Sequence, residues 1–142
     1  IAGAAAIWTN GEKFEISFDE TKQCNTNANW NKCDKINVID FGPIDKGVAL
    51  AAPCAGNMPT KMQTCDIRIS DAVALYTGTG TVPKDKYDLF TAIAHEFGHC
   101  LGLGEVQTSA DKTSVMYFEL GPGEKRRVLS KDDMAGREAL YK

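Results

Sequence analysis

Residues 88–105 read DLFTAIAHEFGHCLGLGE, and they carry the strongest helix signal in the chain. Asp88 is a residue type that caps helix N-termini well, and Gly102 suits the end of a helix because glycine tolerates positive φ. Apolar residues recur between them at spacings of three and four: Phe90, Ile93, Phe97 and Cys100. This spacing predicts one buried face, so we expect an amphipathic helix that leaves its other faces free for polar side chains.

His95, Glu96 and His99 form the pattern H-E-x-x-H within this helix. Side chains four residues apart on a helix lie one above the other, so both imidazoles can bind one metal ion. The adjacent Glu96 is then placed to take a proton from a metal-bound water and pass it to a leaving amine. The chain has only two histidines, and both are in the motif. The pattern therefore predicts a zinc site with Glu96 as general base and acid.

The string from Asp88 closely resembles the active-site helix of the metzincin zinc peptidases, particularly the matrixin branch. The residues Ser114–Tyr117 (SVMY) look like that family's Met-turn, and Leu129–Tyr141 is similar to its final helix. The resemblance implies that Met116 lies beneath the metal. It also implies a twisted mixed sheet of about five strands packed on the active-site helix, with substrate bound as an extended strand along the sheet edge.

The third metal ligand departs from the family pattern. Where matrixins carry a third histidine, this chain has Glu105. Zinc accepts two histidines and one glutamate in other peptidases, so we expect Glu105 to complete the site. Two alternatives stay open: a site that has lost its third ligand, and a glutamate from farther along, either Glu119 or Glu138.

By the same resemblance, residues 117–129 form the wall of the pocket that receives the side chain just after the cleaved bond. Tyr117 and Phe118 are the expected lining residues, and Phe118 stands where matrixins usually have proline. An apolar lining predicts an apolar substrate side chain there. We expect the basic cluster Lys125–Arg127 to be a solvated loop.

The rest of the chain favours strands first and helices afterwards, which indicates an α+β fold. Four runs have strand character: 13–18, 35–41, 47–52 and 66–70. The segment 19–35 is rich in asparagine and is expected to be a loop or weak helix, with Trp30 as its apolar anchor. A last helix is expected from the cap Ser130 to Tyr141, with Asp133 at its third position.

Length and composition indicate one globular domain over residues 1–142. The net charge of -3 gives no basic surface for nucleic acid. No apolar run approaches the ~20 residues of a membrane span, and the start of the chain, Ile1–Trp8, lacks the features of a signal peptide. We therefore expect no nucleic-acid or membrane partner.

Five cysteines in a chain of this size favour an oxidising compartment and hence secretion. Cys100 continues the buried helix face, so we expect it to be unpaired. Pairing the remaining cysteines by nearness gives Cys24 with Cys33 and Cys54 with Cys65, although sequence alone leaves other connectivities open.

The sequence as a whole predicts a secreted, monomeric zinc endopeptidase that hydrolyses peptide or protein substrates with one catalytic zinc ion and no organic cofactor. Calcium binding is undetermined, and the structural zinc of matrixins would need histidines that this chain lacks. One rival is an inactive metzincin-like module that still binds peptide. Another is a two-histidine, one-carboxylate iron site, in which Glu96 would have no role.

Overall fold

The computed structural model describes residues 1–9, 16, 30–31, 33, 36–55, 62–107 and 111–141. Within these residues the order of helices and strands is α1 (Ala2–Ala6), β1 (Ile39–Gly42), β2 (Ala49–Ala55), β3 (Met62–Ser70), β4 (Leu75–Tyr76), β5 (Tyr87–Asp88), α3 (Leu89–Cys100) and α4 (Lys131–Leu140). Strands precede the two long helices, which confirms the expected α+β class.

The main sheet has the strand order β1-β3-β2 in the described part of the chain. β1 runs parallel to β3, with Ile39 opposite Ile67, and β2 runs antiparallel to β3, with Ala49 opposite Ile69. The sheet is therefore mixed, as expected, and a separate parallel pair is formed by β4 and β5. The expected strand over 13–18 lies outside the described residues except for Ile16, and so does most of the expected loop 19–35.

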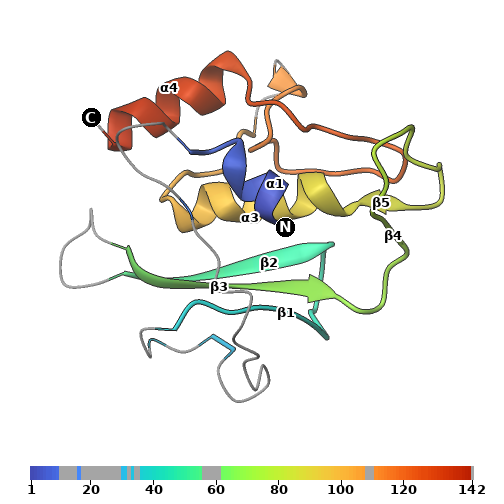
Figure 1. Ribbon diagram of the computed structural model, residues 1–142, viewed down its shortest axis with the longest axis horizontal. Coiled ribbons are helices and arrows are strands. Elements are labelled where there is room, and N and C mark those ends of the chain that lie inside the picture. Colours follow the sequence, from blue (N-terminus) through green and yellow to red (C-terminus); the bar gives the residue numbers. More distant parts are fainter. Residues whose placement is uncertain are drawn as a thin grey trace.

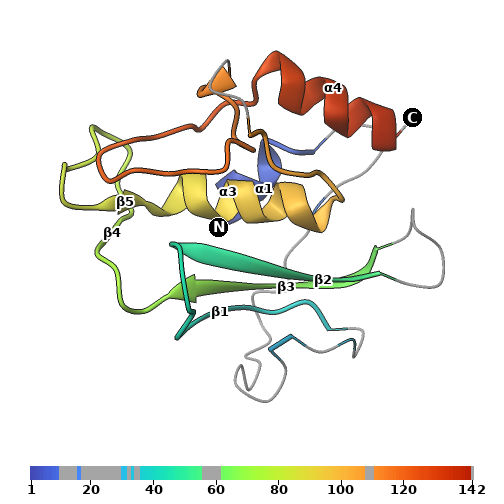
Figure 2. The same ribbon diagram turned by 180° about the vertical axis from the view of Figure 1, so that it is seen from behind.

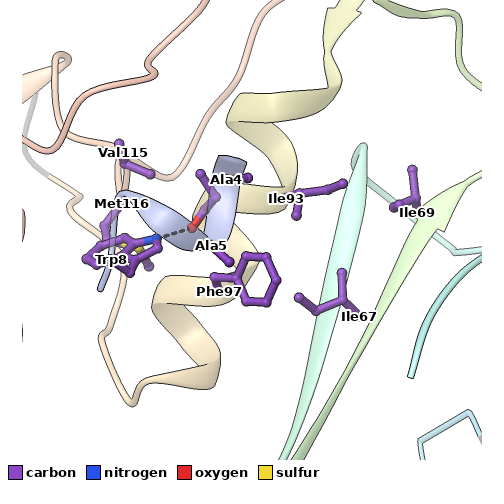
Figure 3. Close-up of a cluster of buried hydrophobic side chains, with 10 residues drawn as sticks. Ala4, Ala5, Trp8, Ile67, Ile69, Ile93, Phe97, Val115 and Met116 are labelled. Atoms are coloured by element: carbon purple, nitrogen blue, oxygen red, sulfur yellow. Dashed lines mark hydrogen bonds between the residues drawn. The ribbon is translucent and has the colours of Figure 1, made fainter. Parts of the chain in front are cut away.

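The helix α3 lies between the sheet and α4, as Figure 1 shows, and the view from behind in Figure 2 gives the same layers. Ile93 and Phe97 of α3 face Ile67 and Ile69 of β3 across the core (Figure 3). The apolar stripe of the sequence is thus the face that packs on the sheet. None of the helices in the described ranges is long and apolar enough to span a membrane.

Both long helices begin and end where their sequence signals indicate. The Asp88 side chain accepts a hydrogen bond from the Thr91 backbone N–H at 3.1 Å, and Gly102 has a φ of +98° just after α3. Ser130 and Asp133 form a reciprocal capping box at the start of α4. The signals at Asp88 and Gly102 thus fix the two ends of α3, the helix that carries the metal motif.

The first eight residues form part of the core, which the sequence did not reveal. Trp8 is completely buried, and its indole N–H donates to the Ala94 carbonyl of α3 at 2.7 Å. Figure 3 shows Trp8 beside Met116, on the side of α3 away from the sheet. The short helix α1 and Trp8 therefore pack against α3 on the side away from the sheet.

The disulfides differ from the expected pairing. Cys33 bonds to Cys54 and Cys65 bonds to Cys100, whereas Cys24 lies outside the described residues. The register of the β2–β3 hairpin explains why nearness failed. In the strand register Cys65 lies opposite Pro53, and Cys54 lies opposite Thr64. Neighbouring residues of a strand alternate between faces, so the side chains of Cys54 and Cys65 point to opposite faces of the sheet. Cys65 shares the face of Ile67 and therefore meets α3, which makes the expectation of an unpaired Cys100 wrong.

On the opposite face of the sheet, a buried ion pair joins β1 and β3. The Arg68 guanidinium donates to both carboxylate oxygens of Asp40, at 2.9 and 2.6 Å, and both side chains are buried. The same guanidinium lies 4.6 Å from the centre of the Trp30 ring, as a cation–π contact. Trp30 thus contacts the sheet through Arg68, and most of the segment that it was expected to anchor lies outside the described residues.

Candidate metal centre

The two histidines of α3 present the same ring nitrogen to one point. His95 Nδ1 lies 2.8 Å from the Val115 carbonyl oxygen, and His99 Nδ1 lies 2.9 Å from the Leu103 carbonyl oxygen. A carbonyl only accepts, so each Nδ1 carries the proton and each Nε2 keeps its lone pair for a metal. Burial lowers the pKa of His95, which favours the neutral ring that a metal needs.

The separation of the two free nitrogens fits a shared ion. His95 Nε2 and His99 Nε2 are 3.0 Å apart. Two nitrogens bound tetrahedrally to one zinc ion at ~2.05 Å would lie about 3.3 Å apart. Two neutral lone pairs have no reason to point at each other unless a cation lies between them, so the geometry fits a metal better than a hydrogen bond.

Glu105 lies at the same point. Its carboxylate and the two imidazoles form a group whose ligand atoms all lie within 4.8 Å of one another. Backbone hydrogen bonds hold this segment in place, because the Val106 N–H donates to the Met116 carbonyl at 2.7 Å and the Phe118 N–H donates to the Val106 carbonyl at 3.2 Å. The Glu105 carboxylate is exposed and accepts a hydrogen bond from Gln107 at 2.7 Å.

Neither alternative ligand, Glu119 or Glu138, belongs to this converging group. Among the described residues, no other set of three or more histidine, cysteine or carboxylate groups converges in this way. Glu138 is an exposed side chain on α4 that pairs with Arg137 at 3.7 Å. Glu119 is exposed on the wall segment. Histidine, histidine and glutamate are therefore the ligand set that the described residues offer to zinc.

Glu96 is buried beside the metal-binding nitrogens, with 7% of its surface exposed. One carboxylate oxygen, Oε2, accepts a hydrogen bond from the Ala51 N–H of β2 at 2.6 Å. Burial raises the pKa of Glu96 to about 7, although His99 and the Ala51 N–H oppose the rise. A carboxylate with such a pKa can both take up and release a proton near neutral pH.

The floor of the site is the turn that contains Met116, which is 2% exposed. A side chain at Gly98 would overlap the Met116 sulfur, so the turn packs directly on the helix between the two histidines. Asp133 of α4 fixes this turn by accepting hydrogen bonds from Ser114 Oγ at 2.6 Å and from the Val115 N–H at 2.9 Å. The sequence indicated only a capping role for Asp133, since nothing in it showed that α4 returns to the turn.

A cleft of about 790 Å³ opens over the metal-binding residues. One side is the edge strand β2 with the residues before it, and the opposite side is the segment 117–120. Tyr117 is 7% exposed and Phe118 is 46% exposed, and both line this cleft, while their role in receiving a substrate side chain stays a prediction. Since β2 pairs with β3 on one side only, in the described residues, its other edge faces the cleft.

The family model described as Matrixin matches residues 1–142. The chain belongs to the matrixin family. Matrixins are zinc-dependent metalloproteases, so the family accounts for the metal geometry, the turn at Met116 and the mixed sheet together. The family assignment that the H-E-x-x-H string suggested is thereby confirmed.

Three relatives of this matrixin show how far the similarity extends. Metalloendoproteinase 1 of Glycine max is 35% identical over 75 residues, which are 50% of this chain and 24% of that protein. Metalloendoproteinase 1-MMP of Arabidopsis thaliana is 44% identical over 54 residues, 38% of this chain and 14% of that protein. Matrix metalloproteinase-20 of Homo sapiens is 41% identical over 66 residues, 43% of this chain and 12% of that protein. The matched segments are thus less than a third of each relative.

The basic cluster Lys125–Arg127 of this matrixin is only partly solvated, because Lys125 is exposed as predicted but the two arginines are not. The side chains of Arg126 and Arg127 are only 8% and 20% exposed. Arg127 forms an ion pair with Asp88, the completely buried N-cap of α3. Burial alone would raise the pKa of Asp88, but the hydrogen bonds from Arg127 and Thr91 outweigh it and hold that pKa below its ordinary value. Arg126 and Arg127 therefore hold this loop against the start of the helix that carries the histidines.

Proposed function

We propose that this domain is a zinc-dependent endopeptidase, with His95, His99 and Glu105 as metal ligands and Glu96 as the group that moves the proton. The observation that carries the proposal is the convergence of two unprotonated imidazole nitrogens and one carboxylate within 4.8 Å, with a buried glutamate beside them. The residues present fit a zinc ion in number, type and spacing.

In peptide hydrolysis, the metal ligands and Glu96 would have different roles. A bound zinc ion would supply Lewis acidity that favours ionisation of water and polarises the substrate carbonyl. Because the Ala51 N–H holds one oxygen of Glu96, the other oxygen is free to take the proton of the attacking water. Glu96 then gives this proton to the leaving nitrogen, and a pKa near neutrality suits both transfers.

Peptide substrate would bind as an extended strand along the free edge of β2. Its backbone would continue the main-chain hydrogen bonding of the sheet, and its side chains would alternate between the cleft and the solvent. The exposed Leu50 and Phe118 on the two rims offer apolar contacts to such a strand. This geometry supports peptide or protein substrates. We also propose that the domain spans residues 1–142 and acts as a monomer.

The two disulfides support a secreted protein, since such bonds persist in oxidising compartments.

A glutamate in place of a third histidine should change the acidity of the metal-bound water. It donates more charge to the metal than a third neutral imidazole, so we expect the hydrolytic water to be somewhat less acidic than in a three-histidine site.

The test combines peptide cleavage with elemental analysis of zinc. The wild-type protein should hold one zinc ion and cleave members of a diverse peptide library. Glu96→Ala should keep the zinc and lose cleavage, with Glu138→Ala, an exposed glutamate of α4, as the matched control that keeps both. Stoichiometric zinc without cleavage of any peptide by the wild type would instead indicate an inactive peptide-binding module.

A further inference from the structure

Arg126 contacts α3 at Thr91, one helical turn before His95. Its backbone N–H donates to Thr91 Oγ1 at 2.8 Å, and Thr91 Oγ1 in turn donates to the Asp88 carboxylate at 2.6 Å. Thr91 and His95 are four residues apart on α3, so they lie on the same face, about 6 Å apart along the axis. The same cleft is lined by Thr91, His95 and Arg126. Arg126 is therefore fixed at the end of the cleft nearest the start of α3.

The guanidinium of Arg126 is buried without a full set of partners. One terminal nitrogen, Nη2, donates to the Glu119 carbonyl at 2.6 Å, and Nη1 lies 3.4 Å from the carboxylate of Glu124, which is itself 56% exposed. The Nε–H is buried and has no hydrogen-bond acceptor. A buried cationic donor without an acceptor is costly, and a bound anionic group is the partner that would satisfy it best.

The position of Arg126 also limits the depth of the cleft. A second cavity of about 740 Å³ adjoins this cleft, since both are lined by Tyr117, Glu119 and Arg126. The guanidinium carbon lies 5.6 Å from the centre of the Tyr117 ring, so the two side chains form one partition. A substrate side chain that enters between α3 and the segment 117–120 would therefore meet a positive charge at the end of the pocket.

Resting on the proposed peptidase function, we propose that Arg126 determines specificity by accepting a carboxylate side chain, with glutamate preferred, at the substrate residue just after the cleaved bond. The apolar walls from Tyr117 and Ala92 would contact the methylene groups of that side chain, while its carboxylate would accept from the guanidinium. The expectation of a purely apolar residue took no account of Arg126, because the sequence did not show that this side chain turns inward.

The test uses pairs of peptides that differ only in glutamate or glutamine, placed in turn at each position around the cleaved bond. Glutamine matches glutamate in shape but not in charge. Cleavage is measured as kcat/KM, and affinity is measured separately by fluorescence anisotropy, so that the pocket is tested even if turnover is absent. Arg126→Gln removes the charge in the pocket, and Lys125→Gln removes an exposed charge from the neighbouring residue as the matched control.

Wild type should favour glutamate by about ten- to hundredfold at the residue after the cleaved bond and at no other position. Arg126→Gln should bring this ratio close to one, and Lys125→Gln should leave both the ratio and the basal activity unchanged. Because each ratio is taken within one variant, a general loss of folding would not imitate the effect. Equal use of both peptides by the wild type, or a ratio that survives in Arg126→Gln, would overturn the assignment. Glutamate preference in binding without any cleavage would support the pocket and count against the peptidase function alone.

Discussion

Gly98→Ala should damage the metal centre although it is a favourable change for an isolated helix. Glycine to alanine inside a helix gains about 1 kcal/mol. Here the new Cβ would overlap the Met116 sulfur and lie 2.9 Å from ring carbon Cζ2 of Trp8. Both neighbours are buried, and Trp8 is tied to Ala94 by its indole hydrogen bond, so neither has room to move. Overpacking of this kind costs up to about 3 kcal/mol, which leaves a net loss of about 2 kcal/mol.

The overlap should also weaken zinc binding. A shift of Met116 would displace the preceding residue Val115, whose carbonyl orients His95. Loss of such an orienting contact weakens metal affinity by about tenfold or more. Urea unfolding of the metal-free protein gives the stability, and competition with a chelator gives the zinc affinity. Gly136→Ala is the matched control. Gly136 lies in the middle of α4, and a Cβ there would meet only the end of the Leu103 side chain. A Gly98→Ala protein with wild-type stability and zinc affinity would refute the packing argument.

The other predictions concern the elements that hold α3. Replacing Cys65 and Cys100 together with alanine should lower the free energy of unfolding by about 3 to 4 kcal/mol, from the 35-residue separation that the disulfide closes, with denaturant unfolding as the measurement. Retained stability would mean that the bond is not formed. Asp88→Asn keeps the helix cap but removes the partner of Arg127, so it should cost about 2 kcal/mol at pH 7, less than a fully buried pair because Arg127 is partly exposed. The pKa of Asp88 is held below its ordinary 3.8, so this contribution is complete above that pH and is lost as the pH falls through the folded-state pKa. The difference between wild type and Asp88→Asn should therefore shrink in acid, and a constant difference from pH 7 to below pH 3 would contradict the assignment.

The metal motif and the two long helices were predictable because their signals are local. Spacing on a helix, a cap at each end and the turn at Gly102 act within a few residues, so the sequence carries them directly. The closeness of Glu105 to the two histidines was predictable in the same way, since the chain turns back only a few residues after His99. In these places local propensity and the final packing agree.

The remaining features depend on contacts between distant segments. The pairing of Cys65 with Cys100 follows from the register of a hairpin, which decides the face on which each cysteine lies. Trp8 and Asp133 take their roles only when α3 and the turn at Met116 are in place. Arg126 seemed solvated because charge runs usually are. Its burial depends on a hydrogen bond to Thr91, 35 residues earlier in the chain.

Zinc affinity with and without the Glu105 carboxylate shows most directly whether Glu105 is the third metal ligand. Chelator competition should show that Glu105→Ala binds zinc at least about a hundredfold more weakly than the wild type. Glu105→His should recover most of the affinity. Glu119→Ala, which removes another exposed glutamate from the same cleft, should leave it unchanged. Wild-type zinc affinity and turnover in Glu105→Ala would show that the third ligand lies elsewhere.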